Sequence, residues 1–404
     1  MSASALPVRA AISSGTYGIM RTPVVRSESL SERIGGDVFL KLESLQVTGS
    51  FKARGALNAL LVRGKENLGD GVVTMSAGNH AQAVAYFARR LGIRATIVMP
   101  ELTASVKVQR TRELGARVVL FGENLADCAE QAANLAANEN LRLIHPYDDI
   151  DVIGGQSTVT LELLEDAGAL DIVLVPTGGG GLLAGAVLAA TELGVHPEIM
   201  GVQSEFFPAY YSAVTGSARA PGGATIADGI AVKLPGKLPL SITNAYVREI
   251  VLVDEVAIEM AVEYLVERER LVVEGAGAVG IAALLAHEDR VRGKRIGIIV
   301  SGGNIDPGLL ASIIARSRIR SGSIARVRVH ILDRPGQLGA IATAVAGVGA
   351  NVLDVQHQRL IGDVPARYAE IDLTVELEPG CGPDTVVAAL LEHGFRAEIL
   401  RNQI

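Results

Sequence analysis

One lysine, Lys52, stands in the segment "VTGSFKARGA" between a glycine turn and an apolar helical stretch. Lysine is usually a solvated surface residue, and at the start of a helix it is most often an ordinary exposed charge. A lysine held beside a carbonyl compound has a different chemistry, because its amine is a nucleophile that forms a Schiff base. The neighbouring motifs must decide between these two interpretations.

A run of four glycines, Gly178 to Gly181, follows the apolar segment "IVLVP" and opens the segment "TGGGGLLAG". Glycines between a strand and a helix leave backbone N–H groups free to face an anion, and the helix N-terminus adds partial positive charge. The segment therefore predicts a phosphate-binding loop. Together with a reactive lysine, such a loop suits pyridoxal phosphate, the common phosphorylated aldehyde cofactor.

A dinucleotide site is the alternative for the same loop. Gly179, Gly181 and Ala184 match the pattern GxGxxA. An acidic residue, Glu198 or Glu205, follows about 20 positions later, as such sites require. This alternative leaves the lysine and the other glycine-containing loops unexplained.

The elements that must position these residues alternate between about residues 36 and 318. Short apolar runs without polar alternation are typical of strands buried on both faces. The predicted strands are "DVFLKLE", "GVVTMSA", "RATIVMP", "ARVVLFG", "LRLIHPY", "DIVLVPT", "EIMGVQS" and "RIGIIVS", with helical stretches between them. The pattern predicts an α/β fold with mostly parallel sheets, whose ligands lie beyond the carboxyl ends of the strands.

The order of predicted strands and helices changes after the basic stretch "ARSRIRSGSIARV" at residues 315–327. The order strand, helix, strand, strand, helix, strand follows, which is typical of a ferredoxin-like βαββαβ module. We therefore expect a first domain at 1–318. A linker at 319–325 and a second domain at 326–404 should follow.

Composition narrows the class of protein. A hydrophobic content of 49% and a charged content of 20% fit a globular chain, and the net charge of −7 argues against a general nucleic-acid binder. The two cysteines, Cys128 and Cys381, form no CxxC pattern, which favours a reducing compartment and argues against a thiolate metal site. No run reaches the ~18 apolar residues of a membrane span, so we expect a cytoplasmic protein.

The motifs "SFKARGA", "SAGNHAQA", "TGGGGLLAG" and "SGGN" occur in this order. Together they resemble the fold-type II pyridoxal-phosphate enzymes, and within them the threonine and serine dehydratase branch, over about residues 15–318. The resemblance implies that 1–318 is a catalytic domain of two open twisted α/β lobes, the smaller one at about 69–148 inserted in the larger. It also implies pyridoxal 5′-phosphate as cofactor and β-elimination of water. L-Threonine would give 2-oxobutanoate and ammonia, and L-serine would give pyruvate. The C-terminal module resembles an ACT domain, an amino-acid-sensing unit.

The resemblance also implies residue roles. Lys52 would carry the cofactor and, once displaced by the substrate amine, would take the α-proton as a base. The expected cofactor-binding residues are Phe51, Lys52, Asn79, Gly178, Gly179, Gly180, Gly181, Leu182, Gly229, Glu274 and Ser301. The expected substrate-binding residues are Ser76, Ala77, Gly78, Asn79 and His80, with His80 as loop structure and not as a base. Ser301 would face the ring nitrogen, and a serine there favours elimination over transamination.

Ala77 separates elimination from racemisation. Serine racemases carry a serine at the matching position as an acid and base on the opposite cofactor face, and alanine has no proton to exchange. The racemase branch also binds a divalent ion through acidic residues. The matching positions here are Gln203, Phe207 and Ala209, so we expect no metal site of that kind, and a monovalent cation stays open.

The ACT-like module should bind an amino-acid effector where its first helix starts, at Gly336, Gln337, Leu338 and Gly339. Inhibition by isoleucine with relief by valine, as in control of isoleucine biosynthesis, and a response to another amino acid are both open. A free strand edge in the module suggests a homo-oligomer, a dimer or a tetramer. Two rival functions also stay open. One is another fold-type II chemistry, such as serine racemisation or β-replacement, and the other is a catalytically silent amino-acid sensor.

Overall fold

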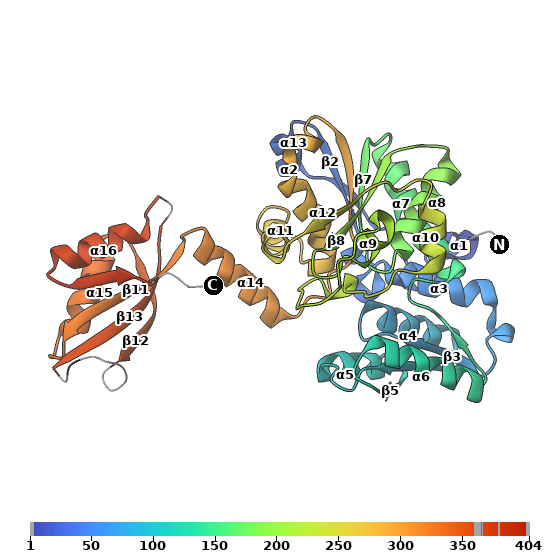
Figure 1. Ribbon diagram of the computed structural model, residues 1–404, viewed down its shortest axis with the longest axis horizontal. Helices are drawn as coiled ribbons and strands as arrows, with labels where there is room; N and C mark the ends of the chain where they lie inside the picture. Colours follow the sequence, from blue (N-terminus) through green and yellow to red (C-terminus); the bar gives the residue numbers. More distant parts are fainter. Residues whose placement is uncertain (1–3, 359–364, 366, 379, 401–404) are drawn as a thin grey trace. The chain divides into compact units, whose positions relative to one another are not determined.

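The computed structural model describes residues 4–358, 365, 367–378 and 380–400. The chain divides into two units, Met1–Asp306 and Pro307–Ile404 (Figure 1). The N-terminal unit is built on two mostly parallel sheets, and the C-terminal unit on one antiparallel sheet. The predicted α/β fold class is confirmed.

A six-stranded sheet forms the larger lobe of the N-terminal unit. Its strands lie in the order β1 (Val24–Arg26), β2 (Asp37–Leu42), β10 (Arg295–Val300), β7 (Ile172–Pro176), β8 (Glu198–Ser204) and β9 (Ile250–Val253). All neighbours are parallel except β1, which is antiparallel to β2. The loops that follow β2, β7 and β10 therefore leave the sheet at the same edge.

Helices cover both faces of this sheet. A side chain at Gly297 of β10 would meet Leu163 of α7 (Ile150–Ala167), whereas its neighbour Ile298 lies against Gly280 of α12 (Gly275–Ala286). Successive residues of a strand point to opposite faces, so α7 and α12 lie on opposite sides of the sheet. Burial on both faces explains why these strands are apolar without alternation.

The smaller lobe is a four-stranded parallel sheet within the expected range 69–148. Its strands lie in the order β5 (Arg117–Leu120), β4 (Ala95–Met99), β3 (Gly71–Met75) and β6 (Leu141–Leu143). Helices α4 (Asn79–Leu91), α5 (Ser105–Glu113) and α6 (Leu125–Asn138) connect these strands. The chain enters this lobe after α3 (Lys52–Arg63) and leaves it before α7, so the small sheet is an insertion in the larger lobe (Figure 1).

All eight predicted strands of this unit form, whereas β1 and β9 were not predicted. These two strands are short, and each lies at an edge of the large sheet. The remaining helices of the unit are α1 (Leu6–Ser14), α2 (Glu28–Ile34), α8 (Gly181–Leu193), α9 (Ala209–Thr215), α10 (Lys237–Thr243), α11 (Glu255–Glu267) and α13 (Glu288–Val291). Single 3₁₀ turns are η1 (Thr16–Gly18), η2 (Glu43–Leu45), η3 (Val47–Gly49), η4 (Lys65–Asn67) and η5 (Asp228–Ile230).

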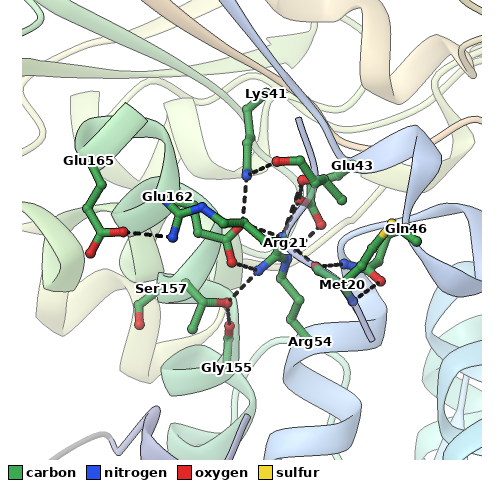
Figure 2. A network of polar contacts seen from close by, with 12 residues as sticks. Met20, Arg21, Lys41, Glu43, Gln46, Arg54, Gly155, Ser157, Glu162 and Glu165 are labelled. Atoms are coloured by element: carbon green, nitrogen blue, oxygen red, sulfur yellow. Dashed lines mark hydrogen bonds and ion pairs between the residues drawn. The ribbon is translucent and has the colours of Figure 1, made fainter. Parts of the chain in front are cut away.

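A buried ionic network ties α3 to the large sheet (Figure 2). Arg54, which is 0% exposed, donates through Nε to Glu43 Oε2 at 2.8 Å and through Nη1 to Glu162 Oε1 at 2.7 Å. Lys41 Nζ donates to Glu162 Oε2 at 2.6 Å, and it also donates to the carbonyl oxygen of Thr22 at 2.7 Å. Two cations thus meet two carboxylates, and the cluster is neutral.

The C-terminal unit has the predicted ferredoxin-like order. Its elements are α14 (Pro307–Arg320), β11 (Ile324–Leu332), α15 (Gln337–Gly347), β12 (Asn351–Gln358), β13 (Tyr368–Glu376), α16 (Pro383–Glu392) and β14 (Arg396–Ile399). The strands lie in the order β12-β13-β11-β14 with antiparallel neighbours. Residues 359, 360, 366 and 401, which lie in predicted strand segments, fall outside the described residues.

The boundary between the units differs from the predicted one at 318. The stretch predicted as a linker, 319–325, contains the end of α14, a turn and the start of β11. Its basic surroundings are not all solvated, because Arg318 Nη2 binds Glu376 Oε1 of β13 at 2.5 Å. This ion pair ties α14 to the sheet of the C-terminal unit.

The buried network makes a prediction for stability. Arg54→Ala leaves Glu43 and Glu162 short of a buried cation, so the free energy of unfolding of the N-terminal unit should fall by about 3–5 kcal/mol. Urea denaturation of the full chain measures this change. Arg33→Ala is the control, because its ion pair with Glu288 is exposed and its loss should cost less than about 1 kcal/mol. Equal losses for the two variants would contradict the prediction.

Candidate active site

A cavity of about 290 Å³ lies where the carboxyl ends of strands from both lobes meet. It is lined by every residue that the sequence predicted for the cofactor and the substrate. These residues are Phe51, Lys52, Ser76, Ala77, Gly78, Asn79, His80, Gly178, Gly179, Gly180, Gly181, Leu182, Gly229, Glu274 and Ser301. Their roles remain predictions, but the structure gathers them in one place.

Lys52 is the first residue of α3, and its side chain reaches into the cavity. Its Nζ donates to the carbonyl oxygen of Pro146 at 2.7 Å and lies 5.1 Å from the centre of the Phe51 ring. Burial by the surrounding protein lowers the pKa of Lys52 to about 8, although the carboxylate of Glu274 acts in the opposite direction. Lys52 is therefore an amine that is readily neutral, and not an ordinary exposed charge.

The glycine loop opens α8 without any side-chain cap. Its N-cap, Gly180, has a φ of 94°, and a Cβ there would lie 2.3 Å from the ring of Tyr210. A Cβ at Gly179 would lie 2.4 Å from the ring of Tyr147. Only glycine fits this loop, and the first N–H groups of the helix stay available for an anion.

Asn79 is held in one orientation by two neighbours. Its Nδ2 donates to Glu274 Oε1 at 2.7 Å, and its Oδ1 accepts from Asn304 Nδ2 at 2.8 Å. Asn304 Nδ2 also donates to the carbonyl oxygen of Thr48 at 2.8 Å. This chain of contacts assigns the amide of Asn79 and leaves its second N–H free to face the cavity.

Glu274 is buried at the start of α12. Desolvation raises its pKa to about 7, and the negative charge of Asp228 acts in the same direction, whereas the hydrogen bond from Asn79 and the charge of Lys107 oppose the rise. Glu274 therefore changes charge near neutral pH, in a cavity where its charge also affects Lys52.

The loop that precedes α4 leaves the N-terminus of that helix uncapped beside Lys52, and Ala77 has no polar side-chain atom. His80 Nε2 donates to the carbonyl oxygen of Ile144 at 3.2 Å. Burial and the nearby Lys52 lower the pKa of His80 to about 3, so its ring stays neutral. This geometry agrees with the expectation that His80 supports the loop and is not a base.

Ser301, at the end of β10, has its Oγ 3.4 Å from the carbonyl oxygen of Ala276. A Cβ on Gly229 would lie 3.0 Å from Ala276 Cβ and 3.5 Å from Glu274 Oε1. Gly229 therefore belongs to the same wall of the cavity as Glu274. This wall carries the residues expected to face the cofactor ring.

Sequence reasoning missed several residues that line the cavity, above all Pro146, Tyr147 and Asn304. A signal was present for each of them. Pro146 and Tyr147 end the predicted strand segment "LRLIHPY", and Asn304 is the last residue of the motif "SGGN". Lys107 and Asp228 also line the cavity, and nothing in their spacing indicated that they meet.

The remaining predicted positions lie elsewhere. Gly336 is the N-cap of α15 with a φ of 89°, and a Cβ on Gly336 or Gly339 would meet nothing within 4 Å. Gln203 Oε1 accepts from the backbone N–H of Tyr211 at 2.9 Å. Within the described residues no group of three or more His, Cys, Asp or Glu side chains is arranged to hold a metal ion. No described helix has the length and apolar character needed to cross a bilayer.

Residues 15–302 match the family described as pyridoxal-phosphate dependent enzymes. The chain belongs to this family. Pyridoxal phosphate fits the residues present here, because the cavity combines a lysine amine with an uncapped helix that starts in a glycine loop. Lys52 would hold the aldehyde carbon, the loop at 178–182 the phosphate, and Asn79 and Ser301 the polar atoms of the ring.

Individual relatives within this enzyme family extend the match. The L-threonine ammonia-lyase of Thermotoga maritima is 41% identical over 384 residues, which cover 95% of this chain and 96% of the relative. The processed form of threonine deaminase isoform 2 from Solanum lycopersicum is a solved structure with 32% identity and a TM-score of 0.71, covering 78% of this chain and 88% of its own. Maize serine racemase has 33% identity and a TM-score of 0.70, covering 80% and 99%.

The lowered pKa of Lys52 makes a prediction for the cofactor-free protein. The rate of covalent binding of pyridoxal phosphate should rise with pH through about 8, because only the neutral amine is a nucleophile. Glu274→Gln should move the midpoint to lower pH, since the Glu274 carboxylate favours the protonated amine. Stopped-flow absorbance over a pH series measures both midpoints. A higher midpoint in the variant would contradict the assigned charge coupling.

Proposed function

We propose that this enzyme deaminates L-threonine to 2-oxobutanoate and ammonia, and L-serine to pyruvate, by β-elimination of water. It would then be a threonine ammonia-lyase, a carbon–nitrogen lyase. The observation that carries the proposal is the amine of Lys52, whose pKa is about 8, in one cavity with an uncapped glycine loop. The L-threonine ammonia-lyase of Thermotoga maritima, which matches almost the whole chain, supports the choice of substrate.

In this proposal pyridoxal phosphate, when bound, makes the α-proton of the amino acid acidic. Lys52 takes that proton at Nζ, which the carbonyl oxygen of Pro146 holds at 2.7 Å on the cavity side. The uncapped N-terminus of α4, with the loop at 76–80, binds the substrate carboxylate through backbone N–H groups. The β-hydroxyl leaves with a proton as water, which gives an enamine. The enamine tautomerises to an imine, and water hydrolyses the imine to 2-oxobutanoate and ammonia.

The other residues orient the ring. The N–H groups of the loop at 178–182 would bind the phosphate, and the second N–H of Asn79 would donate to the ring hydroxyl, because Glu274 and Asn304 hold the amide in place. Ser301 offers a neutral hydroxyl at the ring nitrogen. A serine hydroxyl would not keep the ring nitrogen protonated as a carboxylate would. The ring would then stabilise negative charge less well, and this favours prompt loss of the β-substituent.

A second candidate is racemisation of serine, which the likeness to maize serine racemase favours. The reaction needs a proton donor on the cofactor face opposite Lys52, and Ala77 provides none at the position where the racemases carry a serine. A silent sensor is a weaker candidate, since Lys52, Ser301 and the glycine loop line one cavity. β-Replacement is a further alternative of the same family, and the relatives named as L-threonine ammonia-lyases support elimination instead. We therefore retain elimination.

The proposal predicts oxo-acid formation without racemisation. The full-length protein loaded with pyridoxal phosphate should form 2-oxobutanoate from L-threonine and pyruvate from L-serine, with no D-serine. Lys52→Ala should lose at least about 10³-fold in turnover and the visible absorbance of the lysine-bound cofactor, since it removes the base and the attachment point. A matched control is Lys65→Ala, just after the end of α3 and outside the cavity. Rapid D-serine formation by the natural protein would support the second candidate.

Regulation forms part of the proposal. We propose that the C-terminal unit is an ACT-like regulatory domain that binds an amino acid at 336–339, where α15 starts without a side-chain cap. Gly336 has a left-handed φ and nothing near its Cβ, so the backbone there is open to a ligand carboxylate. Isoleucine, opposed by valine, is the effector we would test first.

The edge strand β12 makes a homo-oligomer part of the same proposal, and the two free cysteines suit a cytoplasmic location.

A pair of glycines in one helix tests the effector site. Gly339→Asp places a negative charge in the first turn of α15, and Gly347→Asp places it in the last turn, with open space at both positions. Gly339→Asp should raise the half-maximal concentration of isoleucine at least about tenfold by repelling the carboxylate. Gly347→Asp should leave that concentration unchanged. Threonine turnover across an isoleucine titration measures both, and identical curves for the two variants would exclude 336–339 as the effector site.

A further inference from the structure

A segment with little regular structure, residues 217–236, joins α9 to α10 along the cavity, and we call it the strap. Its one regular element is the 3₁₀ turn η5 at Asp228–Ile230. The inner residues of the strap line the cavity, namely Asp228, Gly229, Ile230, Ala231 and Val232. The strap therefore forms part of the wall of the cavity that also holds Lys52.

Three backbone N–H donors anchor the strap to the larger lobe. The N–H of Gly222 donates to the carbonyl oxygen of Phe206 at 2.8 Å, and the other two anchors lie on either side of the residues that line the cavity. The N–H of Ile226 donates to Glu255 Oε2 at 2.8 Å. The N–H of Gly236 donates to the carbonyl oxygen of Gly179 at 2.9 Å, and this bond joins the strap to the glycine loop itself. In the stretch between the Ile226 and Gly236 anchors, 227–235, Ala227 and Ile230 are buried, whereas Asp228, Lys233 and Leu234 are exposed.

An ion pair ties this middle stretch to the smaller lobe. Lys107 Nζ of α5 lies 2.7 Å from Asp228 Oδ2, and both residues line the cavity. The side chains are 41% and 60% exposed. An ion pair this exposed is weak and is screened by salt, so it forms and breaks readily. The contact thus joins the two lobes across the cavity without locking them together.

A second contact between the strap and the smaller lobe lies near the Gly236 anchor. Tyr147 Oη donates to the carbonyl oxygen of Leu234 at 3.2 Å. This bond holds the strap close to Gly236, where the backbone is already fixed to the glycine loop. The end of the stretch that carries Asp228 therefore depends on the ion pair for its contact with the smaller lobe.

We propose that the Lys107–Asp228 ion pair is a latch that holds the strap across the cavity and limits the passage of small molecules to and from Lys52. The inference rests on the proposed function only for the identity of those molecules, which would be an amino acid and its oxo-acid product. The latch itself follows from the Ile226 and Gly236 anchors, the cavity lining and the ion pair.

Two further observations agree with a latch. Gly229, next to Asp228, lies against the wall that carries Glu274, so a movement of the strap changes the surroundings of Glu274. The charges of Asp228 and Lys107 also act on the Glu274 carboxyl in opposite directions. Opening of the latch would therefore change the electrostatic surroundings of Glu274, which accepts a hydrogen bond from Asn79.

Limited trypsin cleavage of the full chain tests the opening of the strap. Lys233 lies between the anchors next to Leu234, which is 74% exposed, whereas Arg219 lies in the same strap before the Ile226 anchor. Asp228→Asn and Lys107→Met should each speed cleavage after Lys233 about two- to fivefold, the change that a weak exposed ion pair sustains. Cleavage after Arg219 should not change. Asp228→Glu keeps the charge and should restore the natural rate.

Two controls separate a latch from general loosening. Arg117→Met removes an ion pair with Glu139 of the same length, 2.7 Å, on the smaller lobe outside the cavity, and should leave cleavage after Lys233 unchanged. The double variant Asp228→Asn with Lys107→Met should cleave no faster than either single variant, because the pair acts as a unit. Unchanged cleavage after Lys233 in both single variants, or an equal rise after Arg219, would overturn the proposal.

Binding of pyridoxal phosphate to the cofactor-free protein tests passage directly. If the latch limits passage, Asp228→Asn and Lys107→Met should both speed binding, although they change the charge of the mouth in opposite directions. Opposite effects on the rate would mean that charge alone controls passage, and the latch would be rejected. A natural protein that forms no oxo acid from threonine, yet shows the cleavage differences, would contradict the proposed function and leave the latch intact.

Discussion

The guanidinium of Arg54 is fully buried. The position of Lys52 depends on the carboxylates that neutralise this buried charge. A buried guanidinium is tolerated only when carboxylates and hydrogen bonds replace its hydration. Glu43 comes from the turn after β2 and Glu162 from α7, so compensation forces three elements to meet at one point. Lys52 lies two residues before Arg54 in the same first turn of α3, and it is fixed by this meeting.

Around that point the parallel sheets supply the remainder of the site. Their strands end at the cavity, and short loops after β3, β7 and β10 provide an uncapped helix, a glycine loop and a serine. Desolvation then sets the chemistry, because it lowers the pKa of Lys52 and raises that of Glu274. The charge of Glu274 also acts on Lys52, so the protonation of this amine depends on the carboxyl group that accepts a hydrogen bond from Asn79.

The regular elements were predictable where burial is uniform. Strands covered on both faces read as continuous apolar runs, and this is why β3, β7 and β10 were recognised from the residues alone. The edge strands β1 and β9 were missed, and their length alone does not explain this, because β5 and β6 are as short and were recognised. The basic residues near 319–325 led to the prediction of a linker there. The local sequence does not show that the neighbouring Arg318 pairs with Glu376, which belongs to a strand far along the chain.

The sequence by itself determined the fold class and the motif residues of the site, because glycine loops and apolar runs act over a few neighbouring residues. Only the tertiary structure decided which distant groups share one environment. It brought Asn304 against Asn79, Pro146 against Lys52, and Lys107 against Asp228. Charge coupling and desolvation depend on distances in space between residues that are far apart in the chain, and no local pattern encodes those distances.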